Sequence, residues 1–338
     1  MSTIADYSGK SAVENVTAAI TGAKQTVDFH ALLSLTEERA LERAAQVDAG
    51  EITGRLAGVP FVVKDNFLTY GAPTTAASKF LENFNAPLQA TAIEKLEAEG
   101  AICIGKANLD AFAHGGSTEN SAYGPTLNAI DKTRVAGGSS GGSAVVTALG
   151  FVPFALGTDT GGSIRQPASF NGVVGVKPTY GTVSRYGVVA MASSTDTIGC
   201  FASCVADVEL VMDIMAGHDD SDMTTLPDFF ALAEPLGPQR IGVIKEFMTD
   251  DVDADVRMRV NDYLDKARAA GHTVEEVSMP ILKYALAMYY IIVSAEISSN
   301  LARYDGIRYG KRAEAADLTS VYGDRVTKVS CQKTNGGS

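Results

Sequence analysis

VAGGSSGGSAVVTALGFVPFALGTDTGGSIRQPASFNGVVGVKPT, residues 135–179, carries two clusters of glycine and serine. The first cluster spans Gly137 to Ser143 and the second spans Gly161 to Ser163. Between them, the apolar run from Ala144 to Leu156 is interrupted at Gly150 and Pro153. This pattern predicts a short buried helix, then a turn, and then a strand that leads into the second cluster.

Taken alone, the first cluster is typical of a flexible linker, because glycine and serine without bulky neighbours form solvated random coil. A linker is not expected between apolar segments, however, and Ser163 of the second cluster follows Ser139 by 24 positions (163 − 139 = 24). Glycines let backbone N–H groups approach a ligand closely, and serines add hydroxyls. The paired arrangement therefore favours a site for anion binding or nucleophilic chemistry.

Three other motif interpretations fit less well. A phosphate-binding loop needs Lys-Ser or Lys-Thr after the glycines, and no such pair follows either cluster. A serine hydrolase elbow needs Gly-x-Ser-x-Gly, whereas Arg165 stands where the second glycine belongs. Asp159-Thr160-Gly161 is similar to half of an aspartic protease site, but the chain has no second copy to complete the pair of carboxylates.

Several ordered motifs of the chain occur together in one known family. They include GGSSGGSA, LGTDTGGSIRQPA, LAGVPFVVKDNF around Lys64, GKANLDAFAHGGSTENSAYGPTLN at 105–128 and NLARYDGIRYG at 300–310. On these motifs the chain resembles the amidase signature family, and within it the A subunits of tRNA-dependent amidotransferases, from about Ser34 to Gly310. The resemblance implies an α/β amidase signature fold, in which a central mixed β-sheet is sandwiched between helices.

Amide hydrolysis needs a nucleophile, donors that stabilise the oxyanion and a proton carrier. Ser163 follows two glycines at a predicted strand-to-helix turn and is the candidate nucleophile, although an N-cap serine fits the same pattern. None of the four histidines lies in a motif with an acidic partner, so another group must take the serine proton. The candidate oxyanion hole consists of the backbone N–H groups of Thr160, Gly161, Gly162 and Ser163.

The resemblance supplies the proton carrier. It implies that Lys64 is the base, that Ser139 is a bridging hydroxyl and that the Gly138–Ser139 peptide bond is cis, which is a Ser-Ser-Lys variant of triad chemistry. The residues alone leave Lys64 open as a surface lysine at a strand end, because a lysine acts as a base only where burial lowers its pKa. Structural roles are expected for Asp65, Asp159 and Arg165.

Two further residues are candidates for contacting the substrate. Tyr309, within RYG, is expected to contact glutamine. His114 occupies a position where the resembled subunits commonly carry an apolar residue, near the substrate pocket. A neutral, hydrogen-bonded histidine is the simpler interpretation of His114, and an altered substrate preference is the alternative.

The chain is acidic, since 28 Lys and Arg against 40 Asp and Glu give a net charge of −12. Such a surface repels phosphate backbones, so we expect any tRNA to be held by a partner subunit. The four cysteines form no Cys-x-x-Cys pair, which indicates neither a zinc site nor a disulfide framework. No signal peptide pattern opens the chain, and its longest apolar run, Tyr284 to Ala295, is too short to cross a bilayer, which predicts a cytoplasmic protein without membrane contact.

Helices and strands alternate along the chain, which by itself suggests a largely parallel sheet. Apolar spacing predicts helices after caps at Ser34 and Ser203 and over Ala90–Glu99 and Asp253–Ala270. It predicts strands over Leu56–Val63, Ile102–Ile104, Val173–Val176, Ile241–Ile244 and Thr273–Val277. The predicted organisation is an N-terminal helical segment (1–50), an amidase signature domain (51–327) and a tail (328–338), with Asp219–Pro238 as a candidate linker.

The combined interpretation is a glutaminase subunit that hydrolyses glutamine through an acyl-Ser163 intermediate. The resemblance implies partner B and C subunits, with ATP and Mg²⁺ used in the partner to amidate Glu-tRNA(Gln) or Asp-tRNA(Asn), and no cofactor on this chain. The alternatives are a free-standing amidase for another small amide and a truncated, non-catalytic chain that binds its partners. The family continues past Ser338 with residues for the charged α-groups of glutamine, so we expect a C-terminally truncated chain without glutamine-specific turnover.

Overall fold

The structure is a computed structural model that describes residues 1–226, 237–311, 317 and 319–320. The chain forms two compact units, a larger one made of Met1–Phe230 and Glu296–Ser338 and a smaller one made of Ala231–Ala295. The boundary at Phe230 lies inside the predicted linker. The predicted boundary at residue 50 does not separate units, because the helices before it pack in one core with the main sheet. The predicted tail, 328–338, lies outside the described residues.

The helices of the larger unit are α1 (Ala12–Gln25), α2 (Glu37–Asp48), α3 (Thr91–Ala98), α4 (Gly141–Leu149), α5 (Arg165–Asn171) and α6 (Val205–Met215). Its strands are β1 (Leu32–Leu35), β2 (Pro60–Lys64), β3 (Ile102–Ala107), β4 (Phe154–Asp159), β5 (Val174–Val176) and β6 (Thr197–Ala202). The smaller unit holds β7 (Arg240–Ile244), α7 (Ala254–Ala269) and β8 (Thr273–Val277), and α8 (Ala285–Leu301) crosses the boundary. Short 3₁₀ helices are η1 (Ile4–Asp6), η2 (Val27–Phe29), η3 (Lys79–Leu81), η4 (Ala111–Ala113), η5 (Lys245–Phe247) and η6 (Pro280–Tyr284).

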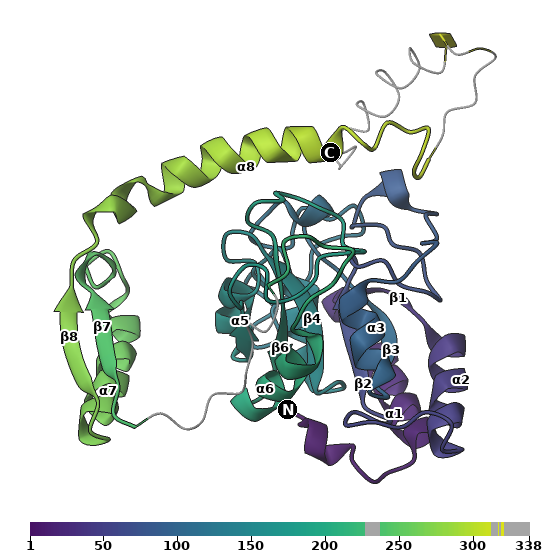
Figure 1. The fold of residues 1–338 in the computed structure, drawn as a ribbon, viewed down its shortest axis with the longest axis horizontal. Coiled ribbons are helices and arrows are strands. Elements are labelled where there is room, and N and C mark those ends of the chain that lie inside the picture. The colour runs from purple at the N-terminus through teal and green to yellow at the C-terminus, as the bar shows by residue number, and fades with distance from the viewer. Residues whose placement is uncertain (227–236, 312–316, 318, 321–338) are drawn as a thin grey trace. The chain divides into compact units, whose positions relative to one another are not determined.

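The larger unit is built on one six-stranded sheet, in the order β1-β3-β2-β4-β6-β5 (Figure 1). Strand β2 runs parallel to β3 and β4, whereas β1 pairs with β3, and β6 with β4 and β5, in antiparallel fashion. The sheet is therefore mixed, as the resemblance implies. The expectation of a largely parallel sheet is wrong, because β6 returns antiparallel to both of its neighbours.

Helices cover both faces of this sheet. Side chains of β2 alternate between the faces, since Phe61 and Val63 pack with α3 and α6 while Val62 packs with α1, α2 and α4. By the same alternation Lys64 points to the α4 face. The central strands are buried along their whole length, which explains why β2 reads as a continuous apolar run.

The stretch 135–179 folds as the spacing predicts, because the first Gly/Ser cluster leads into α4, Gly150 ends α4 in the left-handed region at φ 76°, and β4 follows. Two predicted helix caps are wrong. Ser34 lies in β1, and Thr36 stands at the N-cap of α2 instead. Ser203 lies one residue before Cys204, the N-cap residue of α6, and donates to the backbone oxygen of Ser2.

The smaller unit is a βαβ arrangement, as predicted. Strands β7 and β8 pair in parallel from Arg240 opposite Thr273 to Ile244 opposite Val277. Helix α7 begins at its N-cap Asp253, which accepts a hydrogen bond from the backbone N–H of Asp255.

The helix Pro280–Leu301, formed by η6 and α8, is the one described helix long and apolar enough to cross a membrane by length and composition. Its 22 residues exceed the predicted apolar run, because the helix continues at both ends through less apolar residues. The expectation that this segment is too short to span a bilayer is therefore corrected. One such helix does not by itself establish a membrane span.

Candidate active site

Lys64 closes β2 with a side chain that has no exposed surface. Its Nζ lies 2.7 Å from Ser139 Oγ, 2.9 Å from Thr158 Oγ1 and 3.5 Å from the Thr158 carbonyl oxygen. Within the described residues it forms no ion pair. Burial lowers the pKa of Lys64 to about 7, against the opposing influence of Asp110, Asp159 and Asp196, so a neutral amine is available near neutral pH.

Ser139 lies just before α4, and the Gly138–Ser139 peptide bond is cis, as the resemblance implies. The following residue, Ser140, donates its backbone N–H to the carbonyl oxygen of Ser163 at 3.2 Å and its hydroxyl to the carbonyl oxygen of Thr158 at 3.1 Å. These hydrogen bonds tie the first Gly/Ser cluster to the end of β4 and to the second cluster. The linker interpretation is wrong, because residues 136–143 are buried.

Glycine is required at Gly138 because the Asp110 carboxylate and the backbone of Ser117 come too close for a side chain. A Cβ atom there would lie 2.2 Å from Asp110 Oδ2 and 2.8 Å from the backbone nitrogen of Ser117. Asp110 is itself buried, and its carboxylate accepts backbone N–H groups from Thr118 at 2.9 Å and Asn120 at 3.1 Å. Asp110 therefore holds the loop 115–120 against Ser139.

Ser163 sits between β4 and α5, with 9% of its surface exposed, so its hydroxyl is at the edge of the solvent-accessible region. Asp159 organises this turn, since its carboxylate accepts the N–H groups of Gly162 at 2.7 Å and Ile164 at 3.1 Å and pairs with Arg165 at 3.0 Å. Burial acts to raise the pKa of Asp159, but the hydrogen bonds from Arg165 and the backbone outweigh it and lower that pKa. The expected structural roles of Asp159 and Arg165 match these contacts.

The N–H groups around Ser163 differ in availability. Gly162 already donates to Asp159, whereas in the described part of the chain no hydrogen bond engages the backbone N–H of Gly161 or Ser163. The side chain of Thr160 donates to Asp196 at 2.7 Å. Among the described residues, Gly162 is therefore the predicted member of the oxyanion hole whose backbone N–H is already engaged, while those of Thr160, Gly161 and Ser163 form no hydrogen bond.

Sequence reasoning missed Asp196. This half-buried carboxylate also accepts the N–H groups of Met191 and Ala192, and desolvation raises its pKa. It thereby fixes the loop before β6 against Thr160. Its contact with Thr160, 36 positions earlier, has no local signal in the sequence, because β4 and β6 bring the two residues together only in the folded sheet.

The structure separates the remaining predicted residues from these contacts. His114 is exposed on the loop after η4, and its ring forms no hydrogen bond within the described residues. The prediction of a hydrogen-bonded histidine at this position is therefore wrong. Tyr309 packs edge-on against Phe84 and Tyr304, with ring centroids 5.9 and 5.8 Å apart, beside an apolar hollow of about 320 Å³.

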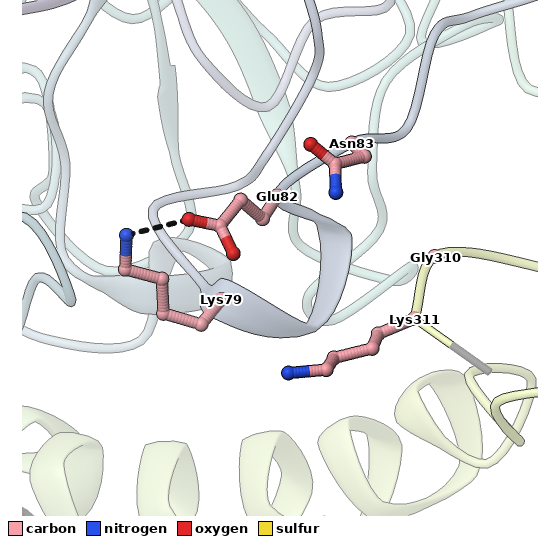
Figure 2. A pocket seen from close by; sticks show the side chains of 5 residues that line it. All are labelled: Lys79, Glu82, Asn83, Gly310 and Lys311. Atoms are coloured by element: carbon pink, nitrogen blue, oxygen red, sulfur yellow. Dashed lines mark hydrogen bonds and ion pairs between the residues drawn. The ribbon is translucent and has the colours of Figure 1, made fainter. Parts of the chain in front are cut away.

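Another hollow, of about 330 Å³, is lined by Lys79, Glu82, Asn83, Gly310 and Lys311. Figure 2 shows these five residues. Lys79 and Glu82 form an ion pair of 2.8 Å across its edge and are both nearly half exposed. None of the residues around Lys64 lines this hollow. In the described ranges no cluster of three His, Cys, Asp or Glu side chains is arranged to hold a metal ion.

Comparison with known sequences gives a family and close relatives. A family model described as Amidase matches residues 11–334. The A subunit of glutamyl-tRNA(Gln) amidotransferase from Gloeobacter violaceus is 52% identical over 306 residues, which cover 88% of this chain and 63% of that protein. The protein of the same name from Methanosarcina barkeri is 50% identical over 310 residues, covering 90% of this chain and 65% of that protein. The chain therefore spans less than two thirds of the length of these relatives.

Solved structures share the fold. The A subunit of glutamyl-tRNA(Gln) amidotransferase from Thermotoga maritima has a TM-score of 0.79 and 37% identity, covering 97% of this chain and 70% of that one. The peptide amidase of Stenotrophomonas maltophilia has a TM-score of 0.78 and 27% identity, covering 95% of this chain and 69% of that one.

Proposed function

Because this chain belongs to the amidase family, we propose that it hydrolyses a primary amide through an acyl-enzyme on Ser163. The observation that carries the proposal is the fully buried Lys64 amine, 2.7 Å from Ser139 Oγ, in a segment whose next residue is hydrogen-bonded to Ser163. A lysine without an ion-pair partner and with a pKa near neutrality is suited to accept a proton. Lys64, Ser139 and Ser163 are the proposed triad.

In the proposed reaction, the Ser163 hydroxyl oxygen attacks the amide carbon. Its proton passes to the Ser139 oxygen while the Ser139 proton passes to Lys64 Nζ, and the carbonyl oxygen becomes an oxyanion. The free N–H groups of Gly161 and Ser163 donate to this oxyanion. When the tetrahedral intermediate collapses, the C–N bond breaks, the nitrogen takes the proton back from Lys64 through Ser139, and ammonia leaves a Ser163 ester that water then hydrolyses.

We propose that the natural amide is glutamine and that the chain acts as the A subunit of a tRNA-dependent amidotransferase. Relatives with this name are about half identical to the chain over most of its length, which supports the assignment. Ammonia would pass to a B subunit that uses ATP and Mg²⁺ to amidate Glu-tRNA(Gln) or Asp-tRNA(Asn), with a C subunit completing a cytoplasmic heterotrimer. The net charge of −12 supports tRNA binding by the partner. Tyr309 and His114 remain proposed substrate contacts.

A free-standing amidase is the second candidate, favoured by the likeness to the peptide amidase structure. It would use the same triad and differ in its substrate. Glutamate release from glutamine, measured for this chain alone and with the B and C subunits of a relative, separates the two: acceleration by the subunits supports the amidotransferase. Release of ammonia from simple amides, unaffected by the subunits, supports the free-standing enzyme.

The triad is tested with a fluorophosphonate probe that labels activated serines. Peptide mapping of the labelled chain should place the adduct on Ser163, and both Ser163→Ala and Lys64→Met should reduce labelling by at least about 10³-fold. Ser8→Ala, which changes an exposed serine outside the site, is the matched control. Labelling of another serine, or normal labelling of Lys64→Met, would refute the triad.

A further inference from the structure

The distances around Lys64 do not say which neighbouring hydroxyl donates its hydrogen bond to the lone pair of the neutral amine. A neutral amine has two N–H groups and one lone pair, and three oxygen atoms surround Lys64 Nζ: Ser139 Oγ, Thr158 Oγ1 and the Thr158 carbonyl. The lone pair must face Ser139 if Lys64 is to take its proton. Both remaining oxygens belong to Thr158, which makes this residue the natural acceptor of both N–H groups.

The Thr158 carbonyl oxygen has no proton, so it only accepts. The Thr158 hydroxyl, in contrast, both donates and accepts, and it competes with Ser139 for the lone pair if its own proton points at Lys64. A third group is therefore needed to receive the Thr158 proton.

Asn66 is the group within reach. Its side chain is 1% exposed, and its amide nitrogen lies 3.2 Å from Thr158 Oγ1. Its amide oxygen is buried and has no hydrogen-bond partner in the described part of the chain, so it is available to accept a hydrogen bond. A half-turn of the amide exchanges the two atoms and directs the oxygen to the Thr158 hydroxyl.

We propose that Thr158 and Asn66 are positioning residues that turn the lone pair of the Lys64 amine toward Ser139. The Asn66 oxygen accepts the Thr158 hydroxyl proton, Thr158 accepts both N–H groups of Lys64, and the lone pair of Lys64 faces Ser139. The hydrogen bonds then point in one direction from Ser139 to Asn66. The inference rests on the proposed function, because it assumes that Lys64 receives the Ser139 proton.

The charges around Lys64 determine how variants shift its titration. Asp110 follows β3, Asp159 ends β4 and Asp196 precedes β6, and all three favour the protonated amine. Asp65, which follows β2, and Lys106 of β3 form an ion pair with each other at 2.9 Å. Thr158→Val keeps the shape and all these charges but removes the hydroxyl that accepts from the ammonium form, so Lys64 should titrate at lower pH. Asn66→Asp adds a carboxylate and should shift the titration to higher pH.

The test follows Lys64 directly, by NMR of the full chain carrying lysine labelled with ¹³C at Cε, where Lys64→Met assigns the signal. We expect Thr158→Val to titrate at least about 0.5 pH units below the wild type and Asn66→Asp at least about 0.5 units above it. Thr158→Ser keeps the hydroxyl and should titrate with the wild type. Fluorophosphonate labelling of Ser163 should fall about 10-fold or more in Thr158→Val and recover to within about threefold in Thr158→Ser.

The inference is overturned if folded Thr158→Val labels and titrates like the wild type, because a residue with only a packing role gives that result. Circular dichroism and the melting temperature establish that each variant is folded. Failure of the proposed function has a different signature. In that case wild-type Ser163 does not label, while the titration shifts of the variants still report whether Thr158 and Asn66 orient Lys64.

Discussion

Lys64 and Lys106 are both fully buried at the ends of neighbouring strands, yet their surroundings differ. Lys64 is surrounded by hydroxyl and carbonyl oxygens, whereas Lys106 lies 2.9 Å from Asp65 and donates to the Phe67 carbonyl oxygen. Burial of a charge without a partner destabilises the fold, while removing one member of a buried ion pair leaves the other uncompensated. The two lysines should therefore respond in opposite ways to the same substitution.

We expect Lys64→Met to raise the free energy of unfolding at pH 7 by about 1–3 kcal/mol, net of the lost hydrogen bonds of the amine, and Lys106→Met to lower it by about 3–5 kcal/mol. Above pH 7 the folded state holds Lys64 neutral, whereas the unfolded chain keeps it protonated up to a pKa of about 10.4. Unfolding takes up a proton in this window, so wild-type stability rises with pH. Urea denaturation at pH 7 and pH 9 measures the free energy of unfolding of both proteins. The difference in favour of Lys64→Met should be smaller at pH 9 than at pH 7.

The same titration should appear in catalysis. Protonated Lys64 cannot accept the Ser139 proton, so labelling of Ser163 by the fluorophosphonate should fall about tenfold per pH unit below the Lys64 pKa of about 7. A labelling rate that stays constant down to pH 5 would show that another group is the base.

The sequence identified some residues of the candidate site and missed others. Ser139, Ser163 and Lys64 were named because motifs of the resembled family contain them, and the structure brings Lys64 to Ser139. Asp110, Asp196, Thr158 and Asn66 carry no local signal. Thr158, Asn66 and Asp196 each make a contact between segments far apart in the sequence, such as Asn66 with Thr158, and spacing along one chain does not encode such contacts.

At the scale of elements, α4 depends on the absence of a side chain at Gly142, in its first turn. A Cβ there would lie 2.5 Å from the backbone oxygens of Ala31 and Asn108. Alanine ordinarily stabilises a helix by about 1 kcal/mol over glycine, but here the nearest atoms are backbone and cannot move aside.

We therefore expect Gly142→Ala to lower the free energy of unfolding by at least about 2 kcal/mol and to reduce Ser163 labelling, since Ser139 precedes this turn. Gly116→Ala is the control, because its nearest neighbour would be Gln166 Nε2 at 3.9 Å. Urea denaturation measures both variants. Equal stability of the two would show that α4 is not held as closely as described.

The positions of helices and strands were easier to predict than the directions in which the strands pair. Apolar runs identified β2, α3, α4, β4 and the βαβ of the smaller unit, because each run has the length and punctuation of one element. The expectation of a largely parallel sheet and the predicted N-caps of α2 and α6 were wrong. A serine with a suitable spacing caps a helix only if the chain turns there, and the pairing of β1 with β3 places Ser34 in a strand instead.

At the scale of the whole molecule, the two units should differ in local stability. Strands β2 and β4 are buried at every residue, whereas β7 and β8 consist of exposed and half-buried residues in a two-stranded sheet. One helix, α7, packs on this sheet, which has neither further strands nor a buried strand among the described residues, so we expect it to be less stable than the six-stranded sheet.

Hydrogen–deuterium exchange followed by mass spectrometry should show amides of β7 and β8 exchanging at least about 100-fold faster than those of β2 and β4. Peptides of α1, which packs on the main sheet, serve as an internal reference within the larger unit. Equal protection in both sheets would contradict this picture.

The larger unit is interrupted by the smaller one, and this arrangement has a consequence for synthesis. All strands of the six-stranded sheet, together with Lys64, Ser139 and Ser163, precede residue 203, while the smaller unit begins at Ala231. During synthesis, every strand of this sheet therefore emerges from the ribosome before the inserted unit does. Because domains generally fold as units during synthesis, we expect the sheet to form first. Asn300, which donates to the carbonyl oxygen of Met191, emerges only after the inserted unit and joins a loop next to strands that were synthesised earlier.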